Sequence, residues 1–212
     1  MNYDKFAAHY ILSPEGQLIK WPVITIRKDG VILEVKNHNT AFREEHGVMF
    51  YSGILLPAFI DIWWKYPQNI EKDIATNISD HFNMGTLLLG FPHSPQKSPT
   101  FPNTNGPILF NQRFPYSHPE IFPDLTTDNT LPIFKRIKKI LRKNKNIELH
   151  KILAAATSEA AIITNHPELG RLEAGCSPGL ILLQNADLVN FKMTPQTTIK
   201  WLMYPSIKSL IE

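Results

Sequence analysis

The sequence predicts an α+β fold. Short β-rich runs separated by turn residues fill residues 1–56, which is typical of strands. Residues 131–145 and 147–163 each carry an apolar stripe with helical spacing. A continuous apolar run at 180–183, bounded by glycine and polar residues, fits a buried strand. The chain therefore changes from strands to helices and back to strands.

The β-rich segment divides into hairpins. Alternating side chains over 6–12 end in a turn cluster, and a second extended run begins near Leu18, which predicts one hairpin. A second hairpin is expected around Asp29-Gly30, because both residues can adopt the positive φ of a tight turn. The strands that flank this turn are expected at 23–27 and 31–35. Two further short strands are expected on either side of Gly53, at 48–51 and 54–56.

The central part of the chain combines one helix with a proline-rich segment. A helix is expected over 68–81. Eight prolines from Pro92 to Pro123 remove backbone donors, so a long loop is expected there, with 108–110 as a short strand. A further strand or helix is expected after Pro195, running to Met203.

Length and composition limit the class of protein. A chain of 212 residues with 43% hydrophobic residues can bury a sizeable core. The balance of 22 Lys and Arg against 19 Asp and Glu is too mild to indicate a nucleic-acid or membrane partner. Cys176 is the only cysteine, which excludes an intrachain disulfide and a cysteine-based zinc site. Because residues 1–12 lack an apolar signal region and no membrane span is present, we expect a cytoplasmic protein.

Four stretches occur in a recognisable order. The first is Asp29-Gly30 in an early hairpin, and the second is SGILLPAFID at 52–61. The third is TTD at 126–128. The fourth is LGRLEAGCSPGL at 169–180, which follows a predicted helix that contains Ala156-Thr157 and Ala160-Ala161. In this order they resemble the amidohydrolase superfamily, in which GxxxxPGFIDxHxH leads from an N-terminal β-sandwich into a barrel. The tail is most similar to deaminases of the aminodeoxyfutalosine deaminase type. The resemblance covers about the first 65 and the last 85 residues.

The resemblance implies a division into two parts. Residues 1–56 and 168–212 are expected to form a composite β-sandwich. Residues 57–167 are expected to hold a remnant of a TIM barrel, the proline-rich loop and two helices. A complete barrel takes about 250 residues. Only 70 residues separate Pro57 from Asp128, so the barrel is expected to be incomplete.

The resemblance also points to a metal site whose first ligands are missing. In the family two histidines at i and i+2 bind one metal, and here Trp63 and Lys65 occupy those positions. An indole is a donor only and an ammonium has no lone pair, so neither is a zinc ligand at neutral pH. Asp61 and Asp128 match the family's functional positions, and the resemblance implies metal binding and proton transfer for Asp128. A helix N-cap or first-turn acid is the alternative for Asp128.

A run of bases offers a different kind of site. Seven bases with no intervening acid lie between Lys135 and Lys145, while the rest of the chain has 15 bases and 19 acids. A solvated helix face is the commoner meaning of such a run, and contact with phosphate or an acidic partner is the alternative. The polyanion contacts would then be Lys138, Lys139 and Arg142.

Two smaller clusters have alternative interpretations. Trp63 and Trp64, with Phe59 and Tyr66, are interpreted as core or as a subunit contact, and a stacking platform for a small ring is the alternative. Polar residues of the proline-rich segment match no known metal-ligand spacing, and a metal site there is the alternative interpretation. They are His93, His118, Glu120 and Asp124.

Together these features favour a catalytically inactive, amidohydrolase-like protein, that is, a pseudoenzyme with an interaction or scaffolding role. No cofactor is expected, and the expected partner is a second copy of the chain or another protein rather than a membrane. Nucleic acid is a weaker alternative that rests on the basic helix. The enzyme alternative is a zinc-dependent C–N hydrolase or deaminase with a non-standard or subunit-shared site. Its candidate ligands are Asp61, His81, His93, His118 and Asp128.

Overall fold

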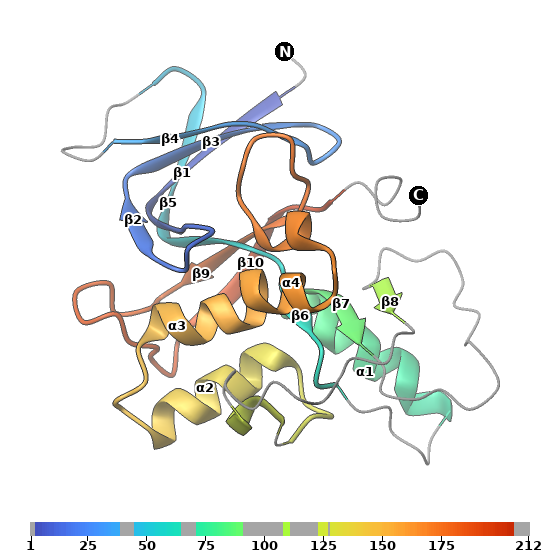
Figure 1. Ribbon diagram of the computed structural model, residues 1–212. Coiled ribbons are helices and arrows are strands. Elements are labelled where there is room, and N and C mark those ends of the chain that lie inside the picture. The colour runs from blue at the N-terminus through green and yellow to red at the C-terminus, as the bar shows by residue number, and fades with distance from the viewer. Residues whose placement is uncertain are drawn as a thin grey trace.

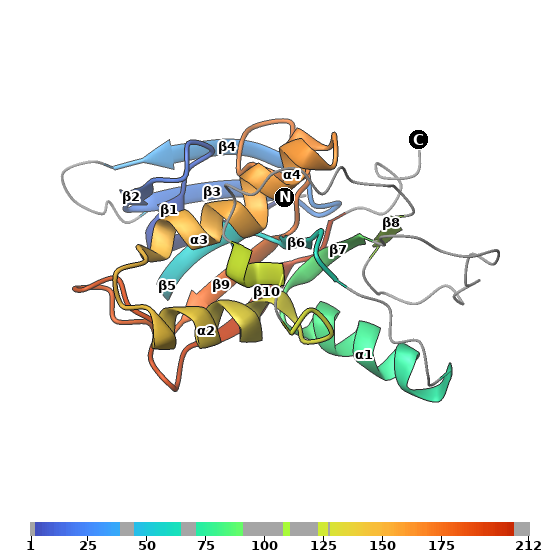
Figure 2. The same cartoon turned by 60° about the horizontal axis from the view of Figure 1, so that its bottom comes forward.

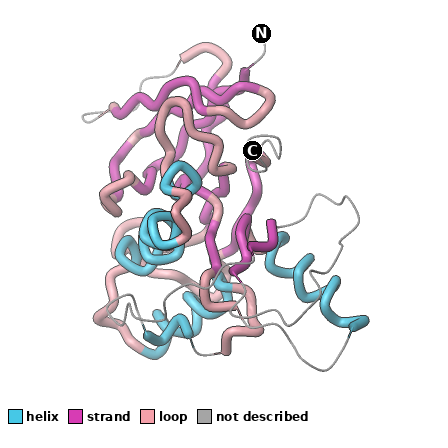
Figure 3. The backbone as a smooth tube through the Cα atoms, turned by 45° about the vertical axis from the view of Figure 1, so that its right-hand side comes forward, coloured by secondary structure: helices cyan, strands magenta, loops and turns pink. Residues whose placement is uncertain are grey.

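A computed structural model describes residues 3–38, 45–64, 71–90, 108–110, 123–126 and 128–205. It contains a mixed sheet, a smaller parallel sheet and a few helices, so the chain is a mixed α and β protein (Figure 1). The strands of the mixed sheet gather at one end of the molecule and the helices at the other (Figure 3). Among the described helices, none combines the length and the apolar character needed to cross a membrane.

Strands from both ends of the described chain share the mixed sheet. Its order is β10-β9-β5-β1-β3-β4, and β2 pairs with β1. β1 and β5 run parallel, whereas every other neighbouring pair is antiparallel. The strands are β1 (Tyr3–Leu12), β2 (Leu18–Lys20), β3 (Pro22–Arg27), β4 (Ile32–Asn37), β5 (Val48–Pro57), β9 (Leu180–Gln184) and β10 (Thr198–Met203).

The predicted hairpins are confirmed. β1 pairs with β2 across the first turn, and β3 pairs with β4 across the turn at Asp29-Gly30, where Gly30 has a φ of 87°. The predicted strand at 180–183 is β9. The segment after Pro195 forms strand β10, which is one of the two predicted alternatives, a strand or a helix.

The prediction of two short strands around Gly53 is wrong, because β5 is one continuous strand. The register of its pairing with β1 shifts between Ala8 and Tyr10, which marks an irregularity beside Gly53. Gly53 has a φ of 149°, and a Cβ atom there would lie 2.3 Å from the carbonyl oxygen of Leu183 in β9. The absent side chain therefore lets β5 pass through the irregularity while β9 stays paired to it.

Replacing Gly53 with alanine should lower the free energy of unfolding by about 3 kcal/mol, because the new Cβ meets the backbone of β9. Urea unfolding followed by circular dichroism measures this loss. Gly47 is the matched control, since it has a φ of 76° but nothing within 4 Å of an added Cβ. Gly47→Ala should cost only the backbone strain, about 1 kcal/mol. Equal losses for the two variants would contradict the close approach of β9.

A smaller sheet of three parallel strands follows directly from β5. The chain passes from one sheet to the other at Ala58, and the order of the second sheet is β6-β7-β8. A helix connects β6 to β7, as parallel neighbours require a crossover. These elements are β6 (Phe59–Asp61), α1 (Glu71–Asn83), β7 (Thr86–Gly90) and β8 (Ile108–Phe110).

The helix predictions are confirmed in position. α1 covers most of the predicted 68–81, and α2 (Ile133–Lys143) lies inside the predicted 131–145. The predicted helix at 147–163 is α3 (Leu149–Ala154), which continues through a π-helical turn (Ala155–Glu159) into α4 (Ala160–Ile163). Short 3-10 turns lie at Pro123–Thr126 and Pro167–Gly170. The strand predicted at 108–110 is β8, and most of the surrounding proline-rich segment lies outside the described residues.

The core is divided by β9 and by the second half of β5, where side chains on both faces of the sheet are buried. Leu56 and Leu183 join the helices and the smaller sheet in one hydrophobic cluster. Leu55 and Leu182 point the other way and join β1, β3 and β4 in a second cluster. Since alternate side chains of a strand face opposite sides, a continuous apolar run suits a strand buried on both faces. The first cluster also surrounds the carboxyl end of β6, where polar residues meet.

Candidate functional site

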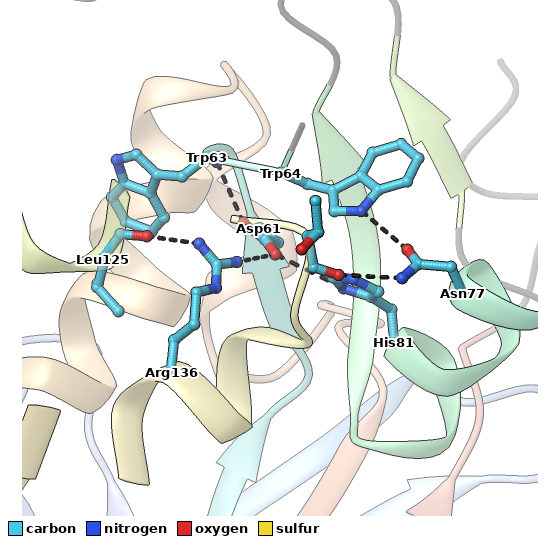
Figure 4. Close-up of polar contacts among 8 residues, drawn as sticks. Asp61, Trp63, Trp64, Asn77, His81, Leu125 and Arg136 are labelled. Carbon is cyan, nitrogen blue, oxygen red and sulfur yellow. Dashed lines mark hydrogen bonds and ion pairs between the residues drawn. The ribbon is translucent and has the colours of Figure 1, made fainter. Parts of the chain in front are cut away.

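Three charged or titratable side chains meet at the carboxyl end of β6, inside the protein (Figure 4). Asp61 is the last residue of β6, Arg136 reaches it from α2, and His81 reaches it from α1. The carboxyl edge of parallel strands is a common place for ligands in α/β proteins. These three residues, called the Asp61 cluster below, are the candidate site.

The carboxylate of Asp61 is bonded on both oxygens. Its Oδ2 accepts a hydrogen bond from Nη2 of Arg136, and its Oδ1 accepts one from the backbone N–H of Trp63 at 3.1 Å. Nη1 of Arg136 donates to the carbonyl oxygen of Leu125. The side chain of Asp61 is 0% exposed and that of Arg136 is 1% exposed. The pair is therefore enclosed, and its charges are balanced by each other.

Arg136 is a residue that the sequence interpretation missed. The basic run of α2 is interpreted as a solvated face, and the burial of Arg136 corrects that interpretation for this one residue. A signal was present in the sequence, because Arg136 lies three residues after Ile133 and four before Ile140, inside the apolar stripe of α2. Asp61 is likewise an acid at the end of a buried run. An acid and a base at two core positions are expected to pair.

His81 is the second partner of Asp61. Its Nδ1 lies 3.6 Å from Oδ2 of Asp61, and its side chain is fully buried. Burial lowers the pKa of His81 below its ordinary value, and this effect outweighs Asp61 and the Thr130 carbonyl, which favour the protonated ring. Arg136 lowers the pKa further. His81 is thus held as the neutral imidazole at neutral pH.

The neutral state of His81 predicts a loss of stability in acid. As pH falls below about 6.5 the unfolded chain takes up a proton that the folded chain does not, so the free energy of unfolding should decrease from that pH downward. His81→Leu keeps a similar volume and should stay within about 1.5 kcal/mol of wild type at pH 7.5. It should also lose less stability between pH 7.5 and 5.5, measured by urea unfolding. Identical losses in the two proteins would show that His81 titrates normally.

The two neighbouring tryptophans point in opposite directions (Figure 4). Trp64 is fully buried, its indole N–H donates to Oδ1 of Asn77 at 3.1 Å, and its ring meets that of His81 edge to face. Asn77 in turn donates to the Thr130 carbonyl at 3.0 Å. Trp63 is partly buried against the core. Trp64 and Phe59 are fully enclosed, so these two rings are core, as interpreted, and offer no face to a ligand; Tyr66 lies outside the described residues.

Asp128 lies outside the Asp61 cluster. Its backbone has a φ of 51°, and its exposed carboxylate forms an ion pair with Lys139. The hydrogen bond from Lys139 lowers the pKa of Asp128, and the charge of the same ammonium adds to this effect. The N-cap alternative is wrong, because Pro132 occupies the N-cap of α2. The structure therefore assigns Asp128 neither a shared site with Asp61 nor a capping role.

The residues that the structure describes do not fit a bound metal. Asp61 and His81 come together, but Arg136 already neutralises the carboxylate. In the described ranges no group of three or more His, Cys, Asp or Glu side chains is placed to hold an ion. Trp63 occupies one lost ligand position and offers no lone pair. The other lost position and the remaining candidates, Lys65, His93, His118 and Glu120, lie outside the described residues, and the side chain of Asp124 is not described.

The three predicted polyanion contacts share one surface. Lys138, Lys139 and Arg142 all line a groove of about 640 Å³ beside α2. Nζ of Lys138 donates to the carbonyl oxygens of Pro195 and Thr197, each at 2.9 Å, so it joins α2 to the loop between β9 and β10. This groove is separate from the buried Asp61 cluster.

Comparison with known proteins supports a fold assignment. No protein-family model matches the sequence, and no curated protein matches it. A crystal structure of a candidate prolidase from Bifidobacterium longum matches 99% of this chain and 98% of its own, with 11% identity and a TM-score of 0.54. The fold is therefore similar to that of the candidate prolidase. An identity this low shows the fold alone.

Two other neighbours match a smaller part of the chain. N-acetyl-D-glucosamine-6-phosphate deacetylase from Mycobacterium smegmatis matches 42% of this chain at 13% identity and a TM-score of 0.31. Aminofutalosine deaminase from Helicobacter pylori also matches 42%, at 14% identity and a TM-score of 0.31. The match spans 24% of the deacetylase and 27% of the deaminase.

Proposed function

We propose that this chain is a non-catalytic protein with an amidohydrolase-like fold and an interaction or scaffolding role. The enclosed pair of Asp61 and Arg136 carries the proposal. A catalytic metal needs anionic or lone-pair ligands and an open coordination position for water. At Asp61 the guanidinium supplies the positive charge instead, and it can neither bind water as a Lewis acid nor lose a proton near neutral pH.

The proposal includes an incomplete barrel. β6, β7 and β8 are parallel, and they follow the stretch that resembles the entry into the family's barrel. We infer that these strands are the remnant of that barrel and that the mixed sheet corresponds to the composite β-sandwich. A short barrel leaves no closed ring of loops to surround a substrate, which favours a role in binding over catalysis.

One observation favours the alternative of a metal-dependent C–N hydrolase or deaminase. Oδ2 of Asp61 and Nδ1 of His81 are 3.6 Å apart, and both a carboxylate and an imidazole can be ligands of zinc. Further ligands would have to come from His93, His118 or a second subunit. Arg136 would also have to leave Asp61 before a metal could bind there.

Metal content tests the proposal. Untagged protein purified without chelator should hold less than about a tenth of an equivalent of zinc or another transition metal per chain. About one equivalent per chain would contradict the proposal and support the hydrolase alternative. His81→Leu, His93→Ala and His118→Ala would then show which side chains bind the metal, because only true ligands reduce the bound metal when replaced.

A further inference from the structure

A basic groove runs along α2 and is distinct from the Asp61 cluster. One wall is α2, and the other is the loop between β9 and β10. Figure 2 shows the backbone of this loop beside α2. Its volume of about 640 Å³ is that of a typical ligand cleft. Its cationic lining residues are Lys135, Lys138, Lys139, Arg142, Lys145 and Lys192.

The loop wall is held in place by its own hydrogen bonds. The hydroxyl groups of Thr194 and Thr197 both donate to the Asn185 carbonyl, at 2.8 and 3.1 Å. Asp187 accepts hydrogen bonds from the backbone N–H groups of Val189 and Asn190, each at 3.0 Å. Together with the two bonds from Lys138, these contacts fix the groove before any ligand binds, which reduces the entropy lost on binding.

The charge of the groove is strongly positive. Six of its lining residues are Lys or Arg. Within the described part of the chain, the one ion pair formed by these six side chains joins Lys139 to Asp128. Charges of one sign in a concave surface raise the local concentration of an opposite charge. The occupant is therefore expected to be acidic.

The apolar lining adds a second requirement. The groove is also lined by apolar side chains that are partly buried against the core, namely Leu141, Ile147, Phe191 and Met193. A purely polar anion would leave this surface without a partner, whereas apolar side chains of a ligand would bury it. Methionine adapts its shape to such ligands. The occupant is thus expected to be both acidic and partly apolar.

The spread of the cations sets the length of the occupant. From Lys135 to Arg142 the helix advances seven residues, about 10 Å, which is two turns. A single phosphate group cannot reach cations spread over that distance. Two turns of another helix match it, with acidic residues at i, i+4 and i+7 facing the bases. Phe191 is the one aromatic side chain among the lining residues, which is a poor platform for the bases of a nucleic acid.

We propose that this basic groove binds an acidic amphipathic helix of a partner protein. The apolar residues of the partner helix contact Leu141, Phe191 and Met193, and its carboxylates pair with Lys135, Arg142 and Lys192. The proposal rests on the interaction role proposed above and names the chemistry of the partner. It is tested separately, because peptide binding and metal content are independent measurements.

The probe is a labelled 18-residue peptide with leucine along one helical face and glutamate elsewhere, and binding is followed by fluorescence anisotropy. We expect a dissociation constant of about 10 µM or lower in 100 mM salt. A peptide of the same composition but scrambled order should bind at least about tenfold more weakly, since it cannot present leucines and glutamates on separate faces. Equal binding of the two peptides overturns the proposal.

Two charge reversals on α2 provide the matched comparison. Arg142 lines the groove and its neighbour Lys143 does not, although both are exposed on the same helix. Arg142→Glu should weaken binding at least about tenfold, while Lys143→Glu should stay within about threefold. Met193→Gln should weaken binding by at least about fivefold, because it places an amide on the apolar lining. Equal effects of the two reversals would show unspecific charge attraction and would contradict a binding site in the groove.

A single-stranded oligonucleotide of 20 thymidines is the third arm. The proposal predicts that it binds at least about tenfold more weakly than the amphipathic peptide at the same salt concentration. Tighter binding of the oligonucleotide, lost in Arg142→Glu, would overturn the proposal in favour of a phosphate-chain ligand. No binding of the peptide at 200 µM would overturn it outright.

Discussion

Replacing Arg136 with methionine should lower the free energy of unfolding by about 3–5 kcal/mol, because it leaves the buried carboxylate of Asp61 without a counter-charge. The variant also removes the donor to the Leu125 carbonyl. Methionine keeps the length of the side chain, so the loss reports charge and hydrogen bonding more than volume. Urea unfolding at pH 7.5 measures the effect.

A double-mutant cycle separates the pair from its surroundings. Asp61→Asn alone leaves the arginine buried and unpaired, and should also destabilise the protein strongly. The double variant, Asp61→Asn with Arg136→Met, removes both charges and should lose about 2 kcal/mol less than the sum of the single losses. Additive losses would mean that the two groups do not compensate each other. The coupling therefore tests the pairing even where each single variant is unstable.

Replacing Trp64 with alanine should lower the free energy of unfolding by about 3–5 kcal/mol, because it empties a fully enclosed site. It also deprives Oδ1 of Asn77 of its donor. Trp64→Phe keeps most of the buried ring and loses the N–H group, so a smaller loss of about 1–2 kcal/mol is expected. The same unfolding experiment compares these variants.

The adjacent tryptophan is the control for this comparison. Trp63 is only partly buried. It donates to Asp61 through its backbone N–H and not through its indole, so the alanine variant keeps this hydrogen bond. Trp63→Ala should therefore cost less than half as much as Trp64→Ala. Equal costs would contradict the division into one core tryptophan and one peripheral tryptophan. Ligand binding that depends on Trp64 without loss of stability would restore the stacking-platform interpretation.

Local patterns in the sequence predicted most of the elements. Asp29-Gly30 predicted a tight turn, and the apolar stripe through Ile133, Ile137 and Ile140 predicted α2, because these signals depend only on residues close in the chain. The single strand β5 was not predicted. Gly53 looks like a turn residue in isolation, and its real role depends on the distant carbonyl of Leu183.

The candidate site was predicted only in part. The resemblance singles out Asp61, and the loss of the histidine pair follows directly from Trp63 and Lys65. The sequence does not predict that Arg136 pairs with Asp61, because the two lie 75 residues apart and Arg136 stands in a run of bases that is typical of a solvated face. His81 was a candidate ligand, and its burial beside Asp61 depends on how α1 packs. Contacts between distant segments are set by tertiary packing, which local patterns do not specify.

We infer that Arg136, and not a metal, neutralises Asp61 in the folded protein. The most direct measurement is urea unfolding of the wild-type chain at pH 7.5 in excess EDTA and again in 100 µM zinc. Any ion that binds the folded state alone stabilises it, by about 2.7 kcal/mol at a hundred times its dissociation constant. We expect no stabilisation by zinc beyond about 0.5 kcal/mol. Stabilisation by zinc of about 2 kcal/mol or more, reversed by EDTA, would contradict the claim.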